Sequence, residues 1–147
     1  MSEALWRWPA HQLATAIRHG AVSATEAVTD SLARVQAVNP ALNAVVDVLA
    51  DEALVAAAAA DAARRRGEAL GPLHGVPVTV KVNVDYRGRA TTNGVVAFKD
   101  NIAVEDSPVV ANLRRAGAIV IGRTNTPAFS VRWFTENDLH GRTLNPW

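Results

Sequence analysis

The chain has 147 residues, of which 49% are hydrophobic and 20% are charged, so it can fold around one buried core. Its 15 basic and 14 acidic side chains are mixed along the sequence, so there is no cluster of basic residues of the kind that binds nucleic acid or an anionic membrane surface. There are no cysteines, which excludes disulfides, thiolate nucleophiles and cysteine metal sites. The first residues show no signal-peptide run and no segment has the length of a membrane span, so we expect a cytoplasmic protein.

Residues 1–70 are expected to form a mainly helical lead-in. Ser23 and Glu26 fit a capping box that opens a helix after the glycine stop at Gly20. That helix is expected to end at Asn39, because a proline follows and disfavours the helical region for the residue before it. The helices are expected at 9–19, 23–39 and 51–66, and a strand is expected at 42–49.

The stretch from Gly71 to Asp85 carries a single lysine, Lys81, in a valine-rich strand. The valines fall on one face of this strand, at positions 76, 78, 80, 82 and 84, and polar residues alternate with them. Two interpretations remain open from the residues alone. Lys81 either lies on the wet side of a half-covered strand, or stands in a catalytic cavity. In a cavity, partial desolvation and neighbours such as Thr79 and Asn83 would free its amine to act as a base.

The second half of the chain predicts one more helix and one buried strand. Residues 86–101 indicate a loop with short strands at most, and Asp106 followed by Ser107 and a proline opens a helix that Gly117 stops. The buried stripe of this helix is expected to comprise Val109, Val110, Leu113 and Ala116. The apolar run 118–122 is typical of a strand covered on both faces. Together the elements predict an α/β fold, a mixed β-sheet layered with helices.

The loop 122–127 leaves the end of the expected buried strand, where ligand sites form in such sheets. An ordinary turn rich in threonine and asparagine also explains these residues, and local evidence alone favours it. No phosphate-binding glycine loop occurs, and the histidines show no metal-ligand spacing, so neither a cofactor nor a metal is expected. These histidines are His11, His19, His74 and His140.

Four sequence blocks occur in the order found in amidase-signature enzymes. They are residues 71–85, Thr91-Thr-Asn-Gly94, 105–127 and 140–147. The chain resembles the first part of such an enzyme over nearly its whole length. The resemblance implies the α/β fold of that family, present only as its N-terminal portion.

The resemblance also implies a role for Lys81, which matches the lysine of the family's Ser–cis-Ser–Lys triad. In that triad the lysine takes a proton from a bridging serine, which activates a second serine to attack the amide carbon. Backbone amides of a glycine-rich loop stabilise the oxyanion, and water then releases the acyl group. Thr124 and Asn125 match a retained pair that is expected to bind substrate or support the site.

Neither triad serine is expected within these residues, because the family's glycine- and serine-rich loop comes shortly after the segment that ends here. None of the following serines lies in such a loop or is a candidate nucleophile: Ser23, Ser31, Ser107 and Ser130. We therefore expect a single incomplete domain over 1–147, with the lysine strand and later α/β elements at 71–147. We expect this chain to be inactive alone.

The chain departs from the family pattern at two positions. Val82 stands where an aspartate often follows the lysine, which removes a charge near the amine, and Ala128 stands where a glutamate is common.

The leading hypothesis is an amidase that hydrolyses linear amide C–N bonds. Its partners are a small-molecule amide and the remainder of the domain, not nucleic acid or membrane, and a homodimer is compatible with the sequence. Two alternatives stay open. The chain is either a non-catalytic scaffold or partner subunit, or the amidotransferase subunit that acts on glutamine for tRNA amidation, which shares these blocks.

Overall fold

The computed structural model describes residues 4–147, and the expectations for residues 1–3 lie outside it. The chain forms two compact units, each built from separate stretches. Unit 1 comprises Leu49–Val78, Asn112–Ile121 and the described residues up to Ala37. Unit 2 comprises Val38–Val48, Thr79–Ala111 and Gly122–Trp147.

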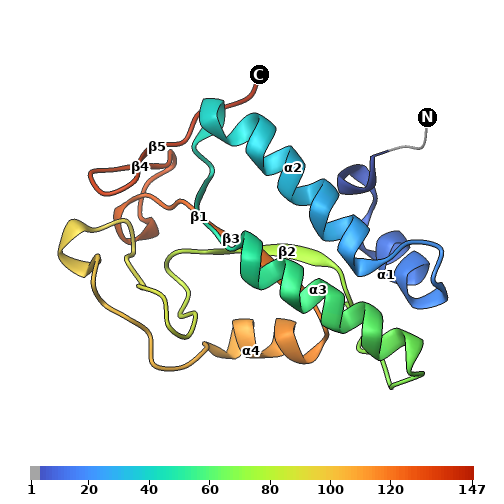
Figure 1. Cartoon of the computed structure of the whole chain (residues 1–147). Coiled ribbons are helices and arrows are strands. Elements are labelled where there is room, and N and C mark those ends of the chain that lie inside the picture. The colour runs from blue at the N-terminus through green and yellow to red at the C-terminus, as the bar shows by residue number, and fades with distance from the viewer. Residues whose placement is uncertain (1–3) are drawn as a thin grey trace. The chain divides into compact units, whose positions relative to one another are not determined.

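Helices and strands alternate along the chain (Figure 1). The α-helices are α1 (Ala10–His19), α2 (Ala24–Leu42), α3 (Ala50–Arg65) and α4 (Pro108–Arg115), and the short 3-10 helices are η1 (Leu5–Arg7), η2 (Val96–Phe98) and η3 (Ala128–Ser130). The strands are β1 (Val45–Val48), β2 (Pro77–Lys81), β3 (Ile119–Thr124), β4 (Glu136–Asn137) and β5 (Gly141–Arg142). No helix among residues 4–147 is long and apolar enough to cross a membrane.

The main sheet has the strand order β1-β3-β2, and β4 pairs with β5 in a separate antiparallel ribbon. β1 runs antiparallel to β3, with Val48 opposite Gly122. The amide of Ile119 donates to the carbonyl of Val76, and the amide of Val82 donates to the carbonyl of Thr124. These two bonds advance along both strands in the same sense, so β2 is parallel to β3 and the sheet is mixed. The predicted α/β fold is confirmed.

The core of unit 1 is formed by small and aliphatic side chains. It comprises Leu13, Ile17, Ala24, Ala27, Val28, Ala53, Ala57, Ile119 and Ile121. The alanines of α3 carry no chemistry; two of them are buried in this cluster because a methyl group lets neighbouring backbones approach closely. Gly75 shows how tight the packing is, since a Cβ on it would lie 2.7 Å from the Cβ of Ala24.

Most predicted elements are present within two residues of their expected bounds, but β1 starts three residues later than the strand expected at 42–49, and α2 continues past its proline to Leu42. The reason is that the chain around Pro40 stays hydrogen-bonded. The amide of Asn43 donates to the carbonyl of Asn39 at 2.7 Å. The Oδ1 atom of Asn39 accepts from the next two amides, those of residues 44 and 45, at 2.8 Å each. The predicted stop at Asn39 was therefore wrong.

Two further expectations were wrong in detail. Val109 does not belong to the buried stripe of α4, because 58% of it is exposed whereas Val110 is fully buried. Gly122 was expected to begin a loop, but β3 runs on to Thr124 because β1 continues to pair with it.

Candidate active site

Lys81 is the last residue of β2, and the alternation predicted for this strand is largely observed. Val80 and Val82 are buried, Thr79 is exposed and Lys81 is half-buried. The amide of Val82 still bonds to β3, and the chain then turns, with the amide of Val84 donating to the carbonyl of Lys81 at 3.0 Å. The lysine therefore lies at the end of the strand, on the face opposite the buried valines.

Hydroxyl and amide groups surround the Lys81 amine. Its Nζ atom lies 3.4 Å from Oγ of Ser130, a long contact for a hydrogen bond. The same Oγ atom lies 3.1 Å from Nδ2 of Asn83 and 2.7 Å from Oγ1 of Thr126. Asn83 was expected to bond to the lysine, but it reaches the amine through Ser130. Its Oδ1 atom is buried and has no partner within the described part of the chain.

Asn125 holds the segment that follows β3. Its Nδ2 donates to the carbonyl of Gly141 and to Oγ1 of Thr143, each at 3.1 Å. Its Oδ1 accepts from the amide of Thr126 at 2.9 Å and from Nδ2 of Asn137 at 2.8 Å. Because both polar ends of this buried side chain are bonded within the chain, the geometry suits a supporting role better than contact with a ligand.

Thr124 is placed differently from Asn125. It ends β3, and its carbonyl accepts the amide of Val82, the residue next to the lysine. The two members of the predicted pair thus make different contacts: Thr124 bonds to the residue next to the lysine through the sheet, and Asn125 bonds to the loop that carries Thr126. A catalytic or binding role for Lys81, Thr124 and Asn125 stays a prediction.

The buried guanidinium of Arg123 organises the segment that follows Lys81. Its Nη2 donates to the carbonyl of Ala90 at 2.9 Å and, over longer distances, to those of Val82 and Val84. Its Nη1 lies 3.4 Å from a carboxylate oxygen of Asp47. Burial lowers the pKa of Arg123, and the neighbouring carboxylate of Asp47 opposes that shift.

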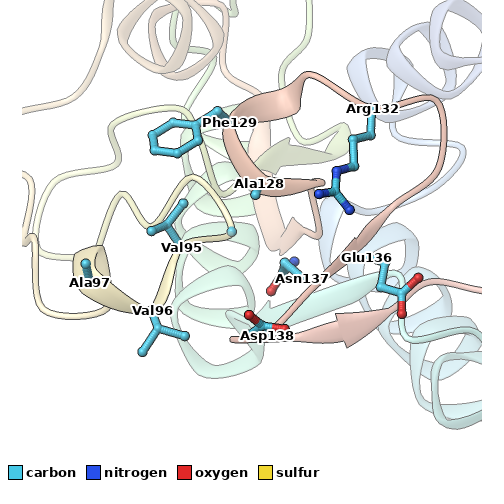
Figure 2. Close-up of a pocket in the computed structure, with 10 residues that line it drawn as sticks. Val95, Val96, Ala97, Ala128, Phe129, Arg132, Glu136, Asn137 and Asp138 are labelled. Atoms are coloured by element: carbon cyan, nitrogen blue, oxygen red, sulfur yellow. The ribbon is translucent and has the colours of Figure 1, made fainter.

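A pocket of about 430 Å³ opens beside Ser130 in unit 2. Figure 2 shows apolar side chains at one end of it and polar or charged ones at the other. The apolar residues are Val95, Val96, Ala97, Ala128 and Phe129, and the polar ones are Arg132, Glu136, Asn137 and Asp138. The ring of Phe129 meets that of Phe98 edge to face, with their centroids 6.0 Å apart. The pocket therefore offers an apolar wall and separate charged groups, and its lining includes Phe129, the neighbour of Ser130 in the sequence.

Comparison with known proteins identifies the family. Residues 26–147 match the model of the Amidase family. The chain belongs to this family. It is 62% identical over 143 residues to the indoleacetamide hydrolase of Bradyrhizobium diazoefficiens, an alignment that covers 97% of this chain and 27% of that protein. It is 43% identical over 143 residues to one subunit of the glutamyl-tRNA(Gln) amidotransferase of Acidothermus cellulolyticus, covering 97% of this chain and 28% of that relative.

Solved structures of the Amidase family share the fold. The crystal structure of a bacterial aryl acylamidase, described as a member of the amidase signature enzymes, matches with a TM-score of 0.87 and 30% identity. That match covers 95% of this chain and 29% of the acylamidase. The resemblance to amidase-signature enzymes is confirmed, and the chain spans less than a third of the length of each of these relatives.

Sequence reasoning did not find three residues that shape this site. Ser130 and Thr126 are four positions apart in the short segment that follows β3, and no sequence pattern pairs them with Lys81. Arg123 lies in the stretch predicted to be a loop. Its position directly after the apolar run 118–122 was the available signal, because an arginine that continues a buried strand must be satisfied by carbonyls and carboxylates.

Proposed function

We propose that this chain supplies Lys81 as the terminal base of an amide hydrolase, and that the rest of an amidase domain supplies the two triad serines. The observation that carries the proposal is the position of Lys81, with its amine at the end of β2 and 3.4 Å from a hydroxyl cluster. The match of residues 26–147 to the Amidase family supports it. We place the reaction in the cytoplasm, in keeping with the cysteine-free sequence.

In the proposed reaction the neutral amine of Lys81 takes the proton of the bridging serine, which in turn takes the proton of the nucleophilic serine. The nucleophilic oxygen then bonds to the amide carbon, and backbone amides stabilise the oxyanion. When the C–N bond breaks, the proton returns along the same path to the leaving nitrogen. Water completes the reaction by releasing the acid from the acyl-enzyme.

We propose a small aromatic amide as the substrate, and indole-3-acetamide is the first compound to test. The support is the 62% identity to a protein named indoleacetamide hydrolase. The second candidate is the glutamine-dependent reaction of a tRNA amidotransferase, which the 43% identity to one of its subunits favours. The two are separated by assaying ammonia release from indole-3-acetamide and from glutamine, the latter with and without partner subunits.

The first measurement is the intact mass of the natural protein. A mass well above 15.6 kDa, with a glycine- and serine-rich loop in the added sequence, supports the proposal. A natural protein of only these 147 residues supports the scaffold alternative instead. In the full-length protein, Lys81→Ala is expected to lower kcat by at least about 100-fold, the effect of removing a general base.

The matched control is Lys99→Ala, because Lys99 is the only other lysine in the sequence and is exposed. This control should retain its turnover. The 147-residue chain alone should neither release ammonia nor react with a fluorophosphonate. Hydrolysis by the isolated chain, or an active Lys81→Ala protein, would contradict the proposal.

A further inference from the structure

The Oγ atom of Ser130 is the meeting point of three polar side chains in unit 2. They are Thr126 at 2.7 Å, Asn83 at 3.1 Å and Lys81 at 3.4 Å. Ser130 has no part in the triad proposed above, and it lies outside any glycine-rich loop. Its position beside the only lysine of the site therefore needs its own explanation.

Thr126 offers an acceptor for the hydroxyl proton of Ser130. The carbonyl of Pro127, at 3.1 Å, is an acceptor for the hydroxyl proton of Thr126, and in that arrangement the Oγ1 atom of Thr126 accepts the proton of Ser130. Asn83 presents an amide N–H to the same oxygen. A hydroxyl has one proton and two lone pairs. With its proton directed at Thr126, Ser130 keeps both lone pairs for the N–H groups of Asn83 and Lys81.

We infer that Ser130 is a positioning residue for the base, whose oxygen accepts an N–H of the Lys81 amine and so fixes the direction of the amine lone pair. The inference rests on the proposed function, because it takes Lys81 as the base. A neutral amine has two N–H bonds and one lone pair. Holding one N–H against Ser130 points the lone pair away from Ser130, toward the group whose proton it takes. Ser130 itself donates no proton to Lys81, so it is neither the bridge nor the nucleophile.

The backbone around Ser130 has a conformation that residues with a Cβ rarely adopt. Phe129 has a φ of 55° and Ser130 a φ of 59°. Two consecutive left-handed residues, one of them a bulky aromatic, cost free energy that the surroundings must offset. The amide of Phe129 donates to the carbonyl of Asn93 at 2.9 Å, and the amide of Ser130 to that of Pro127 at 2.8 Å. Such strain is concentrated at functional sites, and here the strained segment carries the hydroxyl that lies 3.4 Å from the Lys81 amine.

The test is Ser130→Gly in the full-length protein, because glycine removes the hydroxyl and at the same time suits the positive φ. A purely structural serine would be replaced without loss, and the thermal unfolding midpoint should not fall. We expect kcat for the amide substrate to fall roughly 10- to 100-fold, the cost of a misdirected catalytic group, while KM is unchanged. The matched control is Asn43→Gly, which relaxes another positive φ of 52° and should keep wild-type kcat.

Parallel assays of Lys81→Ala separate the failure of this inference from the failure of the proposed function. If Lys81→Ala stays active, the proposed function is wrong and the inference falls with it. If Lys81→Ala is inactive while Ser130→Gly keeps wild-type kcat, only the positioning role is wrong. The double variant should be no slower than Lys81→Ala, because Ser130 acts through the lysine. A further loss in the double variant, or fluorophosphonate found on Ser130 by mass spectrometry, would also overturn the inference.

Discussion

The carboxylate of Asp61, in α3, caps the first turn of α2 and accepts a hydrogen bond from the amide of Ala24 at 2.7 Å. Its second oxygen accepts from the amide of Thr25 at 3.1 Å and from the hydroxyl of Thr25 at 2.6 Å. Burial alone would raise the pKa of Asp61, but these hydrogen bonds outweigh it and the pKa is lowered. A side chain far along the chain thus supplies the acceptors that the start of α2 needs.

Replacing Asp61 should destabilise the protein. Asp61→Ala leaves two backbone amides of α2 without their acceptor, and we expect a loss of about 2 kcal/mol in the free energy of unfolding. Urea unfolding at neutral pH measures it. The control is Asp51→Ala, because Asp51 is an exposed acid of the same helix and should cost about 0.5 kcal/mol. Equal losses in the two variants would contradict the capping role.

The stability that Asp61 provides should be lost in acid. Because its pKa is lowered in the folded state, the folded protein binds fewer protons than the unfolded chain once the pH falls below the ordinary value of about 4. Stability conferred by the carboxylate is therefore full above that pH and declines as the pH falls further. Urea unfolding of wild type and Asp61→Asn from pH 7 to pH 2 should show the difference between them shrinking, and a constant difference would contradict it.

Two glycines with the same backbone conformation should respond differently to alanine. Gly75 and Gly67 have φ values of 76° and 72°, but a Cβ on Gly75 would lie 2.7 Å from the Cβ of Ala24, whereas nothing lies within 4 Å of one on Gly67. Gly67→Ala should cost about 1 kcal/mol, from backbone strain alone. Gly75→Ala adds overpacking and should cost about 3 kcal/mol. Thermal unfolding of both variants separates backbone strain from overpacking. Equal shifts of the unfolding midpoint would show that the side chains around Gly75 move to make room for the added methyl group.

The two arginines beside Asp47 should also differ. Only 2% of the Arg123 side chain is exposed and it binds three backbone carbonyls, whereas Arg89 is 36% exposed. Arg123→Met should cost about 3 kcal/mol in unfolding free energy, because buried carbonyls lose their donor. Arg89→Met should cost less than about 1 kcal/mol. Urea unfolding gives both values, and a small effect at Arg123 would mean that water replaces its donors.

The elements that sequence reasoning placed well are those with local causes. The capping box is one example, since the amide of Ser23 donates to Glu26 at 2.7 Å and the amide of Glu26 donates back to Ser23 at 3.0 Å. The buried strand predicted at 118–122 is another example, because a continuous apolar run predicts burial on both faces. Lys81 was found from alternation and from resemblance to a family, and both depend on neighbouring residues in the sequence.

The contacts that sequence reasoning missed depend on the folded chain. Lys81 and Ser130 are separated by 49 positions, and their meeting requires two left-handed residues that no local preference favours. Arg123 was hidden because its partners are mostly backbone carbonyls, which leave no trace in side-chain patterns. The continuation of α2 past Pro40 depended in the same way on a side chain, Asn39, that bonds to amides beyond the helix end.

The two compact units are interleaved along the chain, because unit boundaries fall after residues 37, 48, 78, 111 and 121 of the described part. No contiguous stretch of coding sequence therefore specifies either unit. Moving one contiguous segment of the chain into another protein therefore cannot transfer one unit without also transferring part of the other unit. Recombination between relatives should keep residues 45–124 from one parent, since a crossover within them separates the strands β1, β2 and β3 of one sheet.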